Sequence, residues 1–331
     1  MKKFTLGARD QSAPNHFRII APGTHFLDRA TILVLGGNQT IQDEQANGNV
    51  KIIEQCLPKS DTCNINLLSV GYNQELVEMH YGRNIMTDDA KAACDAFYID
   101  HILPLLYADE YRKHFKSRKG IEKTLQSITI VSHCGGCMVA NRLLNHLAET
   151  LTTEGIVRSQ RELDNIMNKI QLVGYAPYEK ITQNINAFYI APPVDTESSF
   201  ETILRGMEHK KDAEFPPKFM DAYRRNFTSP EPRDIVKEVL SEINAPITIK
   251  KGSSVLMIPP HFTHSFSCLS ASCRSKHKVD RISGEKIAFI LHLFTQNSIN
   301  AFANRPYGID KNAVYNIISG DEAGDSGASL V

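Results

Sequence analysis

Short apolar runs that end in glycine or proline constrain the fold of this chain most. The runs are rich in β-branched residues or leucine. They occupy residues 31–37, 64–72, 127–136, 170–177, 186–193 and 253–260. Continuous apolar runs of this length are typical of strands that are buried on both faces. We therefore expect a central sheet whose strands are covered on both sides.

Between these runs the apolar residues recur at helical spacing. Residues 88–106 and 138–148 show this pattern, and Thr87 or Asp88 is a suitable N-cap for the first of them. Strands that alternate with helices predict an α/β fold, with a mostly parallel central sheet and helices on both faces. The apolar run 286–302 has no clear period, so it is expected to be either a further strand or a buried helix.

Length and composition predict one domain over residues 1–318. The chain has 331 residues, of which 42% are hydrophobic and 22% are charged, so it can bury a large core. Residues 198–250 are charged and interrupted by prolines, so we expect a helical insertion or lid over the sheet there. Residues 319–331 are small and acidic, and we expect a disordered tail.

Charge and cysteine usage restrict the partners and the compartment. Lys and Arg together number 37, as do Asp and Glu, so the chain lacks the basic excess of a nucleic-acid binder. No run has the length and apolar character of a transmembrane helix, and the N-terminus lacks the apolar region of a secretory signal. Seven cysteines favour a reducing compartment, so we expect a cytoplasmic protein. Export that needs no signal peptide stays open.

The segment Ser132-His133-Cys134-Gly135-Gly136 is typical of a strand that turns sharply into a helix. A nucleophile in such a turn is expected to have a positive φ angle. The residues two before and two after it are expected to press together, and serine and glycine are small enough. The glycine that follows Cys134 leaves its backbone N–H open for an oxyanion, and the start of the helix favours a thiolate.

This segment resembles the nucleophile elbow of the α/β-hydrolase superfamily, with Cys134 where serine usually stands, as in dienelactone hydrolases. The resemblance implies a second oxyanion donor in the glycine-containing loop after the first buried strand, at Gly37 and Asn38. It also implies the chain order nucleophile, acid, histidine. Asp195 and His264 follow later strands in that order, so the resemblance makes Asp195 the acid and His264 the base.

Two other histidines are alternatives for the base. His261 lies in the same loop as His264, and His292 would qualify only if the last strand were 287–294 instead of 253–260. The resemblance implies covalent acyl transfer on an ester, thioester or lactone carbonyl, by hydrolysis or by transfer to another acceptor. The expected ligand is a small-molecule or acyl substrate, and no cofactor is implied.

Three other interpretations of these residues stay open. The chain could be a catalytically inactive hydrolase fold that binds a protein partner through residues 198–250, for example as an exported effector. Cys134 and Cys137 form a C-x-x-C pair, which is a redox motif in other folds. The loop at residues 261–277 has His and Cys spacings that suit zinc ligands, so the chain could be a zinc-stabilised protein. Its candidate ligands are His261, His264, Cys268 and Cys273.

Overall fold

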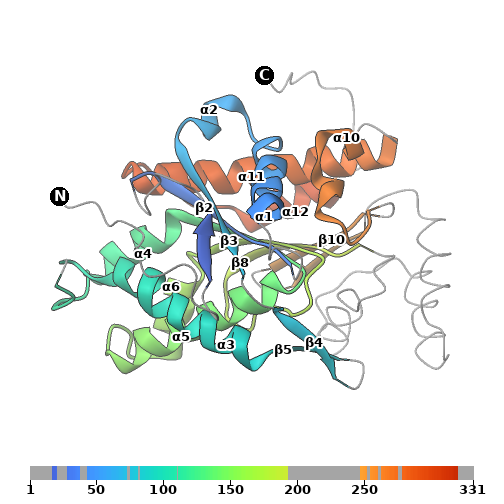
Figure 1. Cartoon of the computed structure of the whole chain (residues 1–331). Helices are drawn as coiled ribbons and strands as arrows, with labels where there is room; N and C mark the ends of the chain where they lie inside the picture. The colour runs from blue at the N-terminus through green and yellow to red at the C-terminus, as the bar shows by residue number, and fades with distance from the viewer. Residues whose placement is uncertain are drawn as a thin grey trace.

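The central element of the structure is an eight-stranded sheet with the strand order β1-β3-β2-β6-β7-β8-β10-β9. The computed structural model describes residues 17–20, 28–37, 43–72, 75–80, 83–109, 111–192, 247–251, 254–259, 262–274 and 278–319. The strands of the sheet are β1 (Arg18–Ile20), β2 (Ala30–Leu35), β3 (Ile65–Gly71), β6 (Ile128–His133), β7 (Gln171–Tyr175), β8 (Asn186–Ile190), β9 (Ile247–Lys251) and β10 (Ser254–Ile258). Helices cover both faces (Figure 1), which confirms the expected α/β fold.

The six inner strands are parallel, and they are the six apolar runs that the sequence predicts as buried strands. The two outer strands, β1 and β9, are antiparallel to their neighbours. Neither was expected: the predicted strands begin at residue 31, and residues 247–250 were assigned to the helical insertion. Both strands gain their ladder hydrogen bonds from one neighbour only, so they carry no doubly buried apolar run.

One layer of helices packs on each face of the sheet. The first layer comprises α3 (Asp88–Phe97), α4 (Arg118–Gln126), α5 (Gly136–Thr153) and α6 (Gln160–Met167). The second layer comprises α1 (Asp43–Glu54), α2 (Lys59–Thr62), the 3₁₀ turn η3 (Phe266–Leu269), α10 (Ala271–Arg274), α11 (Lys278–Phe302) and α12 (Lys311–Ser319). In Figure 1 the second layer lies above the sheet and the first below it. Each layer shares its own hydrophobic core with one sheet face.

The ambiguous run 286–302 belongs to the long helix α11, which packs across β2 and β6. The run 88–106 is helical as expected, with Thr87 accepting a hydrogen bond from the N–H of Ala90 at 3.2 Å. It is not one regular helix, however. After α3 it continues as a π-helical turn, η1 (Tyr98–Ile102), and a 3₁₀ turn, η2 (Leu103–Leu106). Pro104 has no N–H to donate, which prevents a continuous α-helical ladder.

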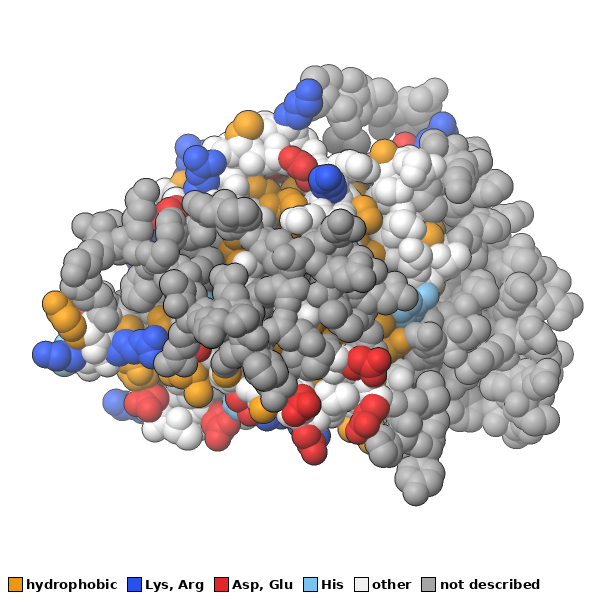
Figure 2. Space-filling view, viewed as in Figure 1, with side chains coloured by type: hydrophobic (Ala, Val, Ile, Leu, Met, Phe, Trp, Pro, Cys, Tyr) orange, Lys and Arg blue, Asp and Glu red, His pale blue; other side chains and the backbone are white. Residues whose placement is uncertain are grey.

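A small hairpin, β4 (Val77–His80) and β5 (Arg83–Met86), stands apart from the main sheet. On the face shown in Figure 2, the described acidic and basic side chains are interspersed, and several acidic ones gather below, where Figure 1 has α3 and α5.

Among the described helices, none combines the length and apolar character needed to cross a membrane. The expected insertion, apart from its last residues in β9, and the expected tail after Ser319 lie outside the described residues.

Candidate functional site at the Cys134 turn

The strand order reverses at one point along the carboxyl edge of the sheet. From β2 the chain crosses to β3 on one side, and it later returns to β6 on the other side of β2. Ligands of open α/β sheets bind where the strand order reverses in this way, outside the carboxyl ends of the strands. In this chain that position lies between the loops after β2 and β6, and the loop after β6 holds Cys134.

Cys134 forms the expected strained turn between β6 and α5. Its φ angle is +55°, a region that residues with a side chain rarely adopt. Its N–H donates to the carbonyl of Tyr175 at 3.0 Å, and its own carbonyl accepts from Cys137 at 3.1 Å. The neighbouring strand ends in a second positive φ, +44° at Ala176. Strained backbone of this kind is concentrated at functional sites, because the surrounding structure has to enforce it.

Two glycines allow other backbone to approach this turn. A Cβ at Gly37 would lie 2.8 Å from the Cβ and 3.1 Å from the Sγ of Cys134. A Cβ at Gly136 would lie 2.2 Å from the carbonyl oxygen of Leu35 and 2.5 Å from that of Gly36. The reason for glycine at 136 therefore differs from the expected one. Gly136 packs against the end of β2, whereas Ser132 contacts the Sγ of Cys137 at 3.1 Å.

Backbone donors surround the Cys134 side chain. Gly135 is the N-cap of α5, so its N–H belongs to the positive end of that helix. In the part of the chain that the structure describes, the N–H groups of Gly37 and Gly135 have no hydrogen-bond acceptor. Two of the three expected oxyanion donors, Gly37 and Gly135, thus have unengaged N–H groups in this part of the chain. Asn38, the other expected donor, lies outside the described residues.

The loop that carries His264 is attached to the same edge of the sheet. The Nε2 of His133 lies 2.8 Å from the carbonyl oxygen of His264, so this nitrogen must donate. The hydroxyl of Tyr175 donates to the carbonyl of Thr263 at 2.6 Å. The His264 ring lies 5.2 Å from the His133 ring and 5.7 Å from the Tyr178 ring, centroid to centroid. His264 is therefore near the turn. Within the described residues, its side chain makes no hydrogen bond to the Sγ of Cys134.

The other candidates for acid and base divide into two groups. Asp195 and His261 lie outside the described residues. The alternative that made His292 the base required a strand at 287–294, and this is wrong, because those residues belong to α11. The Nδ1 of His292 lies 2.6 Å from the Oδ2 of Asp61 in α2, at the end of the sheet where the parallel strands begin.

The other two expected cysteine motifs are the C-x-x-C pair, with Cys137 as its second member, and the zinc loop, which contains Cys268. Burial raises the pKa of the Cys137 thiol, so this member of the C-x-x-C pair stays protonated at neutral pH. In the expected zinc loop, Cys268 contacts the Oγ1 of Thr263 at 3.2 Å. His261 and the side chain of Cys273 are outside the described residues. Among the described side chains, no three potential ligands are grouped around a metal position.

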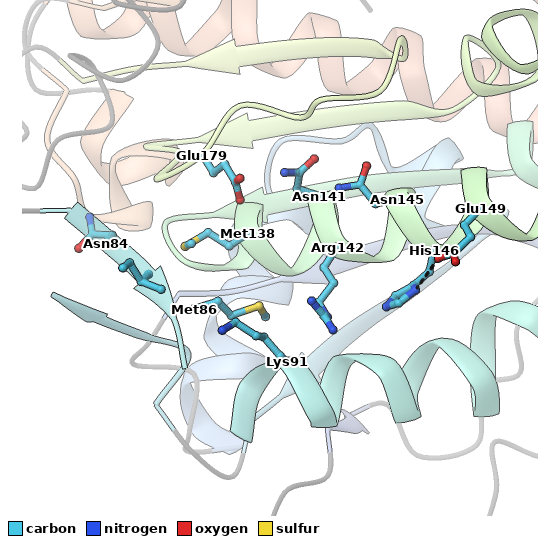
Figure 3. A pocket seen from close by; sticks show the side chains of 11 residues that line it. Asn84, Met86, Lys91, Met138, Asn141, Arg142, Asn145, His146, Glu149 and Glu179 are labelled. Carbon is cyan, nitrogen blue, oxygen red and sulfur yellow. Dashed lines mark ion pairs between the residues drawn. The ribbon is translucent and has the colours of Figure 1, made fainter. Parts of the chain in front are cut away.

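A polar pocket of about 380 Å³ begins close to the turn and extends along α5 (Figure 3). Met138, one helical turn after Cys134, lines it together with Glu179, which follows Tyr178. Burial raises the pKa of Glu179, although a hydrogen bond from Asn141 opposes this effect. The other lining residues are Asn84, Ile85, Met86, Lys91, Asn141, Arg142, Asn145, His146 and Glu149. The pocket therefore offers both donors and acceptors to a polar ligand.

A carboxylate network fixes the cationic wall of this pocket. Arg142 and His146 point from α5 toward α3 (Figure 3). The Nε and Nη2 of Arg142 lie 2.6 and 2.7 Å from the two carboxylate oxygens of Asp95, and the Nε2 of His146 lies 2.6 Å from one of them. Such a bidentate pair holds the guanidinium in one orientation.

This network predicts a pH-dependent contribution to stability. Partial burial raises the pKa of Asp95, but the hydrogen bonds from Arg142 and His146 outweigh it, so the pKa is lowered overall. Because the folded-state pKa is below the unfolded one, the network stabilises the fold above about pH 4, and this contribution is lost as the pH falls through the folded-state pKa. We expect Asp95→Asn to lower the urea midpoint at pH 6 and to change it much less at pH 3.

The control for this measurement is Asp89→Asn, which alters an exposed carboxylate on the same helix. It should change the midpoint little at either pH. An Asp95→Asn variant that loses the same stability at pH 3 and pH 6 would show that the carboxylate charge is not what connects the two helices.

Some residues at the site carry no sequence motif and were missed. Tyr178 contacts the His264 ring, Arg142 and Asp95 shape the pocket, and Tyr72 directly follows β3. For Tyr72 the sequence held a usable signal, because a polar residue directly after a buried strand belongs to the carboxyl edge of the sheet.

No protein-family model matches the chain, and no curated protein matches it.

Proposed function

We propose that this chain is a cysteine-dependent hydrolase or acyltransferase of the α/β-hydrolase type, with Cys134 as its nucleophile. One observation carries the proposal. Cys134 occupies a strained turn with φ of +55° at the switch point of a parallel sheet, next to Gly37 and Gly135, whose N–H groups have no acceptor among the described residues. A buried structural cysteine needs neither the strain nor the free donors. The order of the chemical groups along the chain agrees with the resemblance noted above.

The proposed chemistry is addition followed by elimination at a carbonyl. The base takes the proton of the Cys134 thiol, so the S–H bond breaks. The sulfur attacks the carbonyl carbon of an ester, thioester or lactone, a C–S bond forms, and the carbonyl electron pair moves to oxygen. The N–H groups of Gly135 and Gly37 stabilise that oxyanion. The oxyanion collapses, and the alcohol or thiol leaves with a proton from the base. Water or another nucleophile then releases the acyl group from Cys134.

His264 is the proposed base, and Asp195 the proposed acid that orients it. The support for His264 is its position in the loop that His133 and Tyr175 attach to the turn. Hydrogen bonds between a nucleophile and its base are often long in free enzymes and shorten when substrate binds, so the missing contact to the sulfur does not exclude this role. His133 would act as a positioning residue, since its Nε2 holds the backbone of His264.

The polar pocket along α5 is the proposed place for the non-reacting part of the substrate. It starts one helical turn from Cys134, and its size is in the range of ligand pockets. A thiol nucleophile requires a reducing environment. Among the described residues, the cysteines at positions 56, 63, 94, 134, 137 and 268 form no disulfide, and this agrees with a reducing environment, so we also propose a cytoplasmic location.

A second candidate is a binding module without catalysis. Two observations favour it: the Cys134 side chain is only 5% exposed, and its sulfur has no hydrogen bond to a histidine within the described residues. In that case the pocket along α5 would bind a ligand or a partner segment, and Cys134 would be dispensable.

The test is the reactivity of Cys134 with iodoacetamide between pH 5 and 9, located by mass spectrometry. We expect Cys134 to be labelled at least tenfold faster below pH 7 than the exposed Cys63, because only a stabilised thiolate reacts at that pH. His264→Ala should remove most of this advantage. His114→Ala, which changes an exposed histidine in a distant loop, should leave it intact.

Two results would contradict the proposal in different ways. If Cys134 is labelled no faster than Cys63 at any pH, Cys134 is not an activated nucleophile, and a binding module becomes the better account of the chain. If Cys134 is labelled fast and His264→Ala does not change that rate, Cys134 is still the proposed nucleophile, but the base must be a residue other than His264.

A further inference from the structure

One tyrosine hydroxyl is buried beside the Cys134 turn without a partner. Tyr72 directly follows β3, its side chain is 0% exposed, and its hydroxyl makes no hydrogen bond to any residue that the structure describes. Its ring packs edge-on against Phe17, with centroids 4.8 Å apart. An unpaired buried hydroxyl costs free energy, so its presence requires an explanation.

Position distinguishes Tyr72 from the other groups of this kind. In the part of the chain that the structure describes, the buried side chains with an unpaired polar atom are those of Ser69, Tyr72, Gln126, Asn186 and Ser283. Ser69 lies within a strand, Asn186 begins one, and Gln126 and Ser283 belong to helices. Only Tyr72 of these follows the carboxyl end of a strand, at the edge of the sheet where the candidate site lies.

The strand register brings Tyr72 next to Cys134. Leu35 of β2 is paired with Val70 of β3, and Gly37 and Tyr72 each follow these residues by two positions. A Cβ at Gly37 would lie 2.8 Å from the Cβ of Cys134, so Gly37 lies against the Cys134 side chain. Tyr72 and Cys134 belong to the same hydrophobic core, on the face covered by α3 and α5, and Cys134 is among the groups that act electrostatically on the Tyr72 hydroxyl.

The surroundings also keep this hydroxyl protonated. Burial raises the pKa of Tyr72 well above its ordinary value, and the thiols of Cys94, Cys137 and Cys134 raise it further. The group is therefore a hydrogen-bond donor throughout the neutral pH range. In the low-dielectric interior a donor of this kind gains most from an acceptor that carries negative charge.

We propose that the Tyr72 hydroxyl is a third donor to the oxyanion that forms at Cys134. This inference rests on the proposed function. When the Cys134 sulfur, whose proton the base has taken, adds to a carbonyl carbon, the C–S bond forms and the carbonyl electron pair moves to oxygen. Tyr72 donates a hydrogen bond to that oxygen and keeps its proton. The hydroxyl is unpaired in the free protein because its acceptor exists only while the tetrahedral species is present.

A small alkyl trifluoromethyl ketone tests this without knowledge of the substrate. Addition of the Cys134 sulfur to the ketone creates an oxyanion, whereas alkylation by iodoacetamide creates none. Ketone affinity is measured as protection of Cys134 from iodoacetamide. We expect Tyr72→Phe to weaken ketone binding by about 100-fold, as for the loss of an oxyanion donor. The rate of alkylation without ketone should stay within about twofold of the wild-type rate.

The unfolding midpoint supplies a second readout, with Tyr189→Phe as the matched control. Tyr189 is also buried, but its hydroxyl accepts a hydrogen bond from the N–H of Ile181 at 3.1 Å. Tyr189→Phe should therefore unfold at a lower urea concentration than the wild type. Tyr72→Phe should unfold at the same concentration or a higher one, because it removes a hydroxyl without a partner.

The outcomes separate the two proposals. If the wild type binds the ketone and Tyr72→Phe binds it equally well, the role of Tyr72 is refuted and the nucleophile stands. If Tyr72→Phe also slows alkylation more than tenfold, or unfolds at a clearly lower urea concentration, the hydroxyl supports the thiol or the fold instead, and the inference is wrong. If wild-type Cys134 reacts with neither reagent, the proposed function fails and this inference fails with it.

Discussion

A Gly136→Ala variant is expected to lose about 3 kcal/mol or more of its unfolding free energy, and a large part of it should be unfolded at 37 °C. The added Cβ would lie 2.2 and 2.5 Å from the carbonyl oxygens of Leu35 and Gly36. Both are backbone atoms at the end of a central strand, so no rotamer change can relieve the contact. The start of α5 would have to move away from β2, which would disturb the core on that face.

Urea unfolding followed by circular dichroism measures this effect, and Gly48→Ala is the matched control. Gly48 lies within α1, and a Cβ there would meet nothing within 4 Å. That variant should be more stable than the wild type by about 0.5–1 kcal/mol, since alanine is the better helix former. If Gly136→Ala is as stable as Gly48→Ala, the close packing of α5 on β2 is not a feature of the folded protein.

Cys134→Ala is expected to lower acyl-thioester turnover by at least about 10⁴-fold, because the proposed reaction passes through a bond to this sulfur. The free energy of unfolding should change by only about 1 kcal/mol, since the substitution removes one buried atom and keeps a residue with a side chain at the same φ angle. The measurement is chromatography of a panel of short acyl thioesters after incubation with each variant.

Cys63→Ala is the control for thiol chemistry at the surface, because Cys63 is an exposed free thiol. It should retain full turnover. If the Cys134→Ala variant keeps the wild-type turnover, the reaction does not pass through this residue. If no thioester is turned over by the wild type and ligand binding is the same in both proteins, the binding module is the better account of the fold.

Much of the architecture could be predicted because its causes are local. Strands buried on both faces must be apolar throughout, and this made the six inner strands visible as uninterrupted runs. The run 286–302 remained ambiguous for the same reason: α11 packs on the sheet and against other helices, so its apolar residues have no single period. The outer strands β1 and β9 were not predicted because each pairs with a neighbour on one side only and so has no apolar run of a doubly buried strand.

The residues that the sequence offered for catalysis divide along the same line. The turn at Cys134 is a local steric arrangement, so its spacing and its positive φ angle were foreseeable from five consecutive residues. The ion pair between Asp61 and His292 was not, since the partners are 231 residues apart and neither belongs to a motif. A histidine in an apolar run has no visible partner in the sequence, and for His292 that partner is a fully buried carboxylate.

The sequence by itself determined the α/β class, the buried strands and the position of a strained Cys134 turn, because backbone sterics and hydrophobic burial act over a few neighbouring residues. The tertiary structure alone decided which side chains surround that turn. Tyr72, Gly37 and His264 come from three different strand ends, and the register of the sheet brings them to one edge. Contacts of this kind depend on how strands are ordered and how layers pack, and no local pattern in the chain encodes them.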